Sequence, residues 1–229
     1  MDEQDQWNQF AGDYNERVYS ITSFPEKVLR IIHNVREGRQ LIVGCGSATN
    51  LNQALMDFNK GSVVAADYSR EMLKKAERDC SSARITYIYA DTRNLPFKDE
   101  FDTVISTNSI LPEEPEDAGK MFEQIYGALK PGGRLVAYLP SFDSNEKLKA
   151  QFPEYSLETD PHKKRVWDTT GWQTFHTKES LESMLQKFSR VSIEKVGIES
   201  EAEAAEMERI YGFDYRGRDF FEYFVVAEK

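Results

Sequence analysis

The sequence predicts an α/β fold in which a mostly parallel sheet carries helices on both faces. Two observations predict it. Short apolar runs typical of strands alternate with helix-length amphipathic runs along most of the chain. The first strand-like run, "RQLIV", leads directly into a Gly-x-Gly turn. With 229 residues the chain is long enough for one domain with a large core, so we expect a single domain over 1–229.

The central part of the chain gives the clearest pattern of elements. Apolar runs predict five strands, and amphipathic spacing predicts helices between them. Pro115 suits the first turn of one helix, where a missing N–H is not needed, and "LKPGG" ends that helix because proline cannot continue it. The predicted strands are 39–43, 62–66, 84–90, 101–107 and 134–140, and the helices are 50–58, 70–79 and 115–129.

The two ends of the chain differ from this centre. A helix is predicted over 25–35, after a separate piece at 6–19. Residues 141–175 read as irregular, polar and rich in aromatic residues, and the end of the chain predicts elements at 177–188 (helix), 190–196 (strand), 199–210 (helix) and 220–228 (strand). We therefore divide the domain into four parts: an N-terminal helical cap (1–38), a cofactor-binding core (39–140), a substrate lid (141–176) and a C-terminal part of the sheet (177–229).

Composition limits the classes of partner. The formal net charge is −10 and the isoelectric point is about 5.0, which disfavours nucleic acid and anionic membrane surfaces as partners. Cys45 and Cys80 form neither a metal-ligand pattern nor a disulfide framework, so we expect no metal and a reducing, cytoplasmic location. The acidic start "MDEQDQWNQF" is unlike a signal peptide, and no apolar run is long enough for a membrane span.

Polar or glycine residues follow four successive predicted strands. In an open α/β sheet, ligands bind beyond the carboxyl ends of the strands. Gly44 and Gly46 would let a ligand approach the backbone, Asp67 can accept both hydroxyls of a ribose, and Asp91 can accept a hydrogen bond from an exocyclic amine. Thr107, Asn108 and Ser109 would stand at the mouth of the same cleft. Each carboxylate is also a plausible helix N-cap, and the two roles are compatible.

These residues resemble the class I S-adenosylmethionine-dependent methyltransferases that act on small molecules. The resemblance rests on "LIVGCGSATN", "VVAADYSREML", "YIYADTRNLPFKDEFDTVIS", "IYGALKPGGRLVAYLP" and the early "WNQFAGDYNE". It implies a Rossmann-like sheet of seven strands with the last strand antiparallel, and S-adenosylmethionine as cofactor. It also implies cofactor contacts at Tyr14, Tyr19, Gly44, Cys45, Gly46, Asp67, Tyr68, Met72, Asp91, Thr92, Asn108 and Ser109.

The sequence departs from the family pattern at two positions. The family usually has an acidic residue two positions before the first glycine, where this chain has Ile42, and Ala48 takes the place of the third glycine. The leading interpretation is methyl transfer to an oxygen, nitrogen or carbon of a small molecule. The alternatives are a fold of this type that binds the cofactor as a regulatory or partner subunit, and an NAD(P)-dependent oxidoreductase.

The segment 141–176 supplies the candidates for acceptor binding. It holds six aromatic residues that could build an apolar pocket or hold a cation, and Trp167 and Trp172 are our candidate substrate contacts. His176 is the candidate general base, although methyl transfer does not require one. The six aromatic residues are Phe142, Phe152, Tyr155, Trp167, Trp172 and Phe175.

Overall fold

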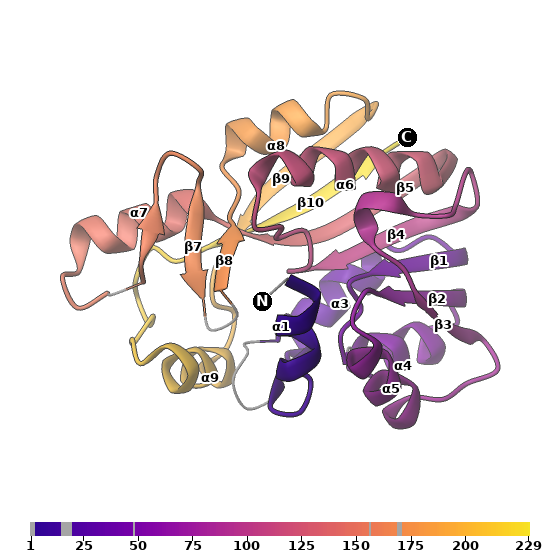
Figure 1. Ribbon diagram of the computed structural model, residues 1–229, viewed down its shortest axis with the longest axis horizontal. Helices are drawn as coiled ribbons and strands as arrows, with labels where there is room; N and C mark the ends of the chain where they lie inside the picture. The colour runs from indigo at the N-terminus through magenta and orange to yellow at the C-terminus, as the bar shows by residue number, and fades with distance from the viewer. Residues whose placement is uncertain (1–2, 15–19, 48, 156, 169–170) are drawn as a thin grey trace.

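The computed structural model describes residues 3–14, 20–47, 49–155, 157–168 and 171–229. A seven-stranded sheet runs through its centre in the order β3-β2-β1-β4-β5-β10-β9, and β10 is antiparallel to both of its neighbours while the other pairs are parallel (Figure 1). The predicted fold class is therefore confirmed. The strands are β1 (Gly38–Val43), β2 (Gly61–Asp67), β3 (Ile85–Tyr89), β4 (Phe101–Thr107), β5 (Leu129–Pro140), β9 (Arg190–Val196) and β10 (Glu222–Glu228).

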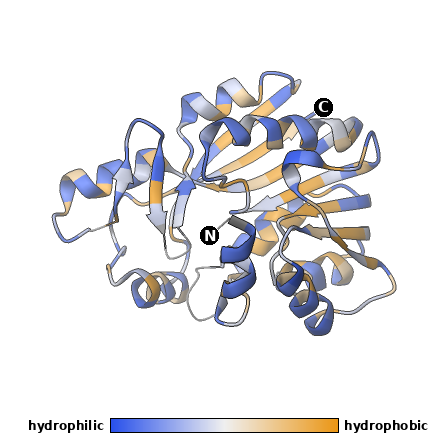
Figure 2. Ribbon diagram, viewed as in Figure 1, coloured by the Kyte–Doolittle hydropathy of each residue, from blue (hydrophilic) through white to orange (hydrophobic). Residues whose placement is uncertain are grey.

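Helices cover both faces of this sheet. One face packs against α6 (Pro115–Ala128) and α8 (Lys178–Met184), and the other against α3 (Pro25–Asn34), α4 (Thr49–Asp57) and α9 (Glu201–Tyr211). Because the central strands are buried on both faces, they read as continuous apolar runs, which Figure 2 shows as orange strands between bluer helices. The remaining helix of this layer, α5 (Arg70–Asp79), follows β2 and contacts β2 and β3.

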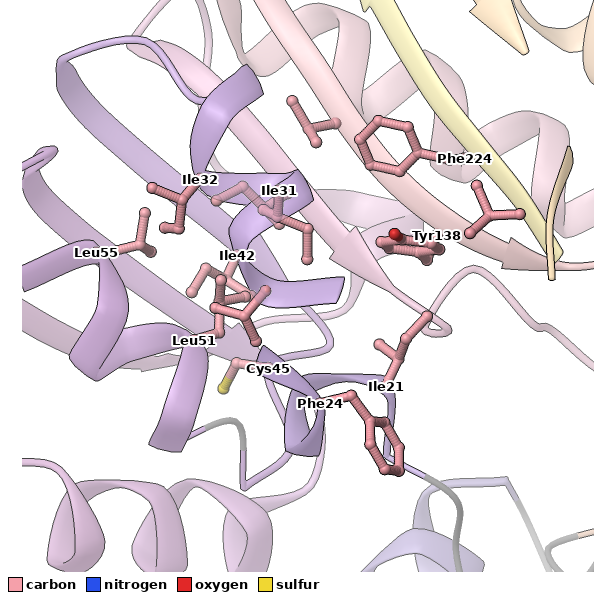
Figure 3. Close-up of a cluster of buried hydrophobic side chains, with 14 of the residues drawn as sticks. Ile21, Phe24, Ile31, Ile32, Ile42, Cys45, Leu51, Leu55, Tyr138 and Phe224 are labelled. Carbon is pink, nitrogen blue, oxygen red and sulfur yellow. The ribbon is translucent and has the colours of Figure 1, made fainter. Parts of the chain in front are cut away.

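Ile42 has a plain structural role. It is fully buried in the apolar cluster between the sheet and helices α3 and α4, together with Ile31, Leu51 and Leu55 (Figure 3). An acidic side chain at this point would be surrounded by apolar groups, so the loss of the family's acid is matched by the packing around it.

The segment 141–176 is more regular than we predicted. It contains helix α7 (Phe142–Gln151) and a small antiparallel sheet of β6 (Thr159–Asp160), β7 (Arg165–Asp168) and β8 (Gly171–Thr174). The expectation of irregular structure was wrong because strands of two to four residues are too short to give a detectable apolar period. One signal was available, since Ser141 caps α7 by accepting from the Ser144 backbone N–H at 3.0 Å.

Several elements differ from prediction at their ends. The helix predicted over 177–188 ends at Met184, and the last strand begins at Glu222 instead of at 220. The segment before α3 contains helix α1 (Glu3–Phe10) and a short 3-10 helix, η1 (Ile21–Ser23). Within the described ranges, no helix combines the length and apolar character that a membrane crossing needs.

Candidate active site

Two adjoining pockets lie at one edge of the large sheet. Strands β1 to β5 end at this edge, and because β10 runs antiparallel to β5, its first residue, Glu222, lies there too, paired with Pro140. The segment that holds α7 and the small sheet, together with α9, gathers beside it at the left of Figure 1. The pockets are thus built from strand ends, from the N-terminal segment and from elements close to the C-terminus.

The first pocket is where the predicted cofactor residues meet. It has an open volume of about 720 Å³, and ten of the twelve predicted cofactor residues line it. They are Tyr14, Gly44, Gly46, Asp67, Tyr68, Met72, Asp91, Thr92, Asn108 and Ser109. Trp7, Ala90, Arg93, Thr107, Leu111, Pro112 and Met121 complete the lining. Of the other two predicted residues, Cys45 lines the second pocket, and Tyr19 lies outside the described residues.

The turn after β1 needs glycine at two positions. Gly44 and Gly46 have φ values of +58° and +51°, a region that side chains rarely adopt. At Gly44 there is also no room, because a Cβ would lie 2.4 Å from the Cβ of Ser109. The Ser109 hydroxyl donates to the Val43 carbonyl at 2.6 Å, which holds the end of β4 against the end of β1.

Asp67 joins this turn to the next strand end. Its carboxylate accepts from the backbone N–H of Gly46 and of Ser69, both at 2.8 Å, and it is 6% exposed. Burial raises the pKa of Asp67 to about 6, and the backbone donors oppose that rise. Each carboxylate oxygen can accept more than one hydrogen bond, so Asp67 keeps the capacity to accept hydroxyl donors from a ligand.

Asp91 follows β3 and is held by its own loop. It caps a short 3-10 helix, η2 (Thr92–Asn94), by accepting from the Arg93 backbone N–H at 2.8 Å. The Arg93 guanidinium also bonds both carboxylate oxygens, at 3.0 Å from Nε. Asp91 therefore both caps the 3-10 helix and lines the first pocket. Thr92 is buried beside it in the lining of the same pocket.

The second pocket continues from the first. Trp7, Tyr14, Gly44, Thr107, Asn108 and Leu111 line both. The second pocket, with an open volume of about 970 Å³, adds aromatic and apolar side chains from the lid, from α9 and from the loop before β10. Those side chains are Tyr155, Leu157, Phe175, Met207, Tyr211, Tyr215 and Phe220.

Glu222 is a charged residue of the second pocket that we did not predict from the sequence. It lines the second pocket, is 2% exposed, and accepts from Asn108 Nδ2 at 2.8 Å. Burial raises the pKa of Glu222 to about 7, while Lys27 and the hydrogen bond from Asn108 oppose the rise. The signal that could have found it is the direction of the last strand, because an antiparallel strand begins where its parallel neighbours end.

Three of the lid candidates lie away from the pockets. Trp167 and Trp172 face each other across β7 and β8 with ring centroids 5.5 Å apart, and neither is among the described residues that line these two pockets. His176 is fully buried, its Nε2 lies 2.8 Å from the Ile110 carbonyl oxygen, and burial lowers its pKa to about 4. The lid reaches the second pocket through Gln173 and Phe175 instead.

Comparison with known proteins identifies the family. Residues 41–133 match the model of a methyltransferase domain. The ubiquinone/menaquinone biosynthesis C-methyltransferase UbiE of Wigglesworthia glossinidia brevipalpis is 30% identical over 184 residues, which cover 71% of each chain. The corresponding enzyme of Desulfotalea psychrophila is 31% identical over 102 residues, 43% of this chain and 41% of that one, so the match there spans about two fifths of the relative.

A solved structure shows the same fold over the whole chain. Phosphoethanolamine N-methyltransferase 2 of Haemonchus contortus, in complex with phosphomonomethylethanolamine and S-adenosylhomocysteine, has a TM-score of 0.67 and 19% identity. The similarity covers 100% of this chain and 61% of that one. Together with the relative matched over 71% of its length, these findings show that the chain belongs to the class I S-adenosylmethionine-dependent methyltransferases.

Proposed function

We propose that this protein transfers the methyl group of S-adenosylmethionine to an oxygen, nitrogen or carbon atom of a small molecule. The observation that carries the proposal is the shared wall of the two pockets, where six residues line both. One pocket would hold the methyl donor and the other the acceptor. Because the two pockets share lining residues and adjoin, the methyl carbon of the donor and the accepting atom can meet inside the protein.

The residues of the first pocket fit S-adenosylmethionine. The glycine turn has no Cβ at Gly44 and Gly46, so its backbone N–H and carbonyl groups can face the pocket that both residues line. These groups suit the amino and carboxyl ends of a methionine. Asp67 would accept the ribose hydroxyls, and Tyr68, Met72, Asp91 and Thr92 would surround the adenine.

The protein's own contribution would be alignment and exclusion of water. When bound, S-adenosylmethionine supplies a methyl carbon that is already activated by a positive sulfur. Helix α1 lies over the first pocket, because Gln4 donates to the Tyr68 carbonyl at 2.9 Å and the Ser69 hydroxyl donates to Asn8 Oδ1 at 2.9 Å. Trp7 lies in α1 and Tyr14 follows it, and both line the two pockets. We expect them to shield bound ligands from water.

The names of the relatives suggest two kinds of acceptor. The curated relatives are described as C-methyltransferases of quinone biosynthesis, and the structural neighbour as an N-methyltransferase of phosphoethanolamine. An aromatic-lined pocket that ends at a carboxyl group suits a small organic acceptor better than a protein or nucleic acid chain. Because both cysteines are free and buried, we also propose that the protein works in the reducing cytoplasm.

The buried Ile42 keeps one alternative in view, namely a subunit that binds S-adenosylmethionine without transferring its methyl group. The two functions differ in turnover and agree in cofactor binding. Formation of S-adenosylhomocysteine in the presence of an acceptor therefore separates them.

Calorimetric titration with S-adenosylmethionine, S-adenosylhomocysteine and NAD tests the proposed cofactor. We expect micromolar binding of both adenosyl compounds by the wild type and at least about a tenfold loss in Asp67→Ala, because the ribose loses a charged acceptor. Asp79→Ala is the matched control, since Asp79 is exposed at the end of α5 and pairs with Arg78. Binding of NAD alone, or equal affinity in Asp67→Ala and wild type, would refute the proposal.

A further inference from the structure

The carboxyl group of Glu222 has no assigned role in the cofactor pocket, yet it lies buried in the pocket beside it. Its Oε1 accepts from Asn108 Nδ2 at 2.8 Å, and its Oε2 has no hydrogen-bond partner among the described residues. A buried carboxyl oxygen without a partner is rare in a folded protein, because the desolvated group loses the hydrogen bonds it had in water. A ligand that donates hydrogen bonds would restore them.

Asn108, the hydrogen-bond partner of Glu222, supplies a second acceptor atom. Asn108 uses its Nδ2 to bond Glu222, and its buried Oδ1 is without a partner among the described residues. Asn108 follows β4 in a left-handed backbone conformation with φ of 50°, which non-glycine residues adopt uncommonly. This conformation places an amide at the wall that the two pockets share. Both unpartnered atoms accept hydrogen bonds, so they call for a ligand with several donors.

The remaining lining of the second pocket favours a cation. Of the described residues that line it, Glu222 alone has an acidic or basic side chain. Seven aromatic residues line the space, and the face of an aromatic ring attracts positive charge. They are Trp7, Tyr14, Tyr155, Phe175, Tyr211, Tyr215 and Phe220. An anionic acceptor would meet a carboxylate here with no cation to pair with, whereas an ammonium group would meet a carboxylate and aromatic faces.

We propose that the acceptor is a small amine whose nitrogen is bound by Glu222 and Asn108, and that Glu222 removes the proton that blocks the nitrogen lone pair. The inference rests on the proposed function, since it assigns the acceptor of that reaction. In the proton step an N–H bond of the ammonium group breaks and an O–H bond forms on Glu222 Oε2. The products are a neutral amine with a free lone pair and a neutral carboxylic acid, so charge and atoms balance.

The charges around Glu222 suit this exchange. Lys27 from α3 faces the carboxyl region but is itself occupied, with Nζ 2.7 Å from the Gly197 carbonyl oxygen and 3.2 Å from Glu203 Oε1. Burial raises the pKa of Glu222 most, Lys27 and the hydrogen bond from Asn108 lower it, and Glu203 from α9 raises it further. Tyr138 of β5 is a neutral neighbour whose own pKa is raised by burial. The resulting pKa of about 7 lets the carboxyl group hold or release a proton near neutral pH.

The test is titration of protein saturated with S-adenosylhomocysteine, using matched pairs of amine and alcohol. The probes are phenethylamine against phenethyl alcohol and butylamine against butanol, with hydrocinnamate as an anion. We expect the wild type at about pH 8 to bind at least one amine about tenfold more tightly than its alcohol, and to bind the anion worst. This preference should weaken as the pH falls below about 7, where Glu222 becomes protonated.

Glu222→Gln keeps an oxygen that can accept from Asn108 but removes the charge. We expect its preference for amine over alcohol to fall below about twofold and to lose its pH dependence between about pH 5.5 and 8. Glu194→Gln, an exposed glutamate on β9, is the matched control and should keep both. The proposal is overturned if no amine is preferred over its alcohol, or if the preference survives in Glu222→Gln.

Failure of this inference can be told apart from failure of the proposed function. Binding of S-adenosylhomocysteine is measured in the same samples before the amine is added. Normal cofactor binding without an amine preference overturns only the role of Glu222. If the wild type does not bind S-adenosylhomocysteine, the proposed function itself is overturned.

Discussion

Replacing Gly44 with alanine adds one methyl group at the tightest point of the turn between β1 and α4. The new Cβ would lie 2.4 Å from the Cβ and 2.9 Å from the Oγ of Ser109, and the residue has φ of +58°. A left-handed backbone costs a non-glycine residue about 1 kcal/mol. Overpacking of this kind costs about 1–3 kcal/mol more. We therefore expect the free energy of unfolding to fall by about 3 kcal/mol.

Gly46→Ala separates the two effects because Gly46 has nearly the same backbone conformation without the crowding. Its φ is +51°, and among the described residues a Cβ there would meet only Tyr14, at 3.7 Å from the hydroxyl oxygen, an ordinary contact. Its free energy of unfolding should fall by only about 1 kcal/mol. Chemical denaturation of both variants without ligand gives the comparison.

A double-mutant cycle identifies the clashing partner. Combining Gly44→Ala with Ser109→Gly removes the contact, so the two changes should couple favourably by about 2 kcal/mol. Equal losses in Gly44→Ala and Gly46→Ala, or no coupling with Ser109→Gly, would refute the steric reasoning.

Three further predictions concern other parts of the molecule. Lys27→Met should lower the free energy of unfolding, measured by denaturation, by about 3–5 kcal/mol, because it removes the cation that pairs with the fully buried Glu203, and adding Glu203→Gln should restore most of that loss. His176 has a pKa of about 4 in the folded protein and 6.5 in the unfolded chain, so only the unfolded chain gains a proton as the pH falls from 6.5 towards 4. The free energy of unfolding should therefore fall by about 3 kcal/mol over this range, and His176→Gln should flatten that pH profile. Trp167→Ala should leave S-adenosylhomocysteine and amine affinity within about twofold in calorimetry, because Trp167 packs on Trp172 outside both pockets; a tenfold loss would contradict this.

The cofactor half of the site was predictable from sequence because parallel strands all end at one edge. Four residues of this half each stand at or just after the end of a strand that is recognisable by its apolar run, so their meeting requires no knowledge of register. They are Gly44, Asp67, Asp91 and Asn108. The number of strands and the antiparallel direction of β10 came from resemblance to the family, since an apolar run carries no sign of its direction.

The acceptor half depends on register and on very short strands. Whether Trp172 or Gln173 faces the pocket is decided by the two-residue alternation of β8, a strand of four residues, and the structure turns Gln173 inward. Glu222 reaches the site because β10 begins opposite Pro140. No local sequence pattern encodes which side of β8 faces the pocket or where β10 begins. Both are set by contacts between segments far apart in the chain.

A crystal structure with S-adenosylhomocysteine bound tests the two-pocket arrangement most directly. We predict that the ribose hydroxyls lie about 3 Å from the carboxylate of Asp67, with the adenine beside Asp91 and Thr92. The sulfur should stand at the wall near Asn108 and face the pocket that contains Glu222. A sulfur that points away from the second pocket, or a ligand bound elsewhere, would contradict methyl transfer between these pockets.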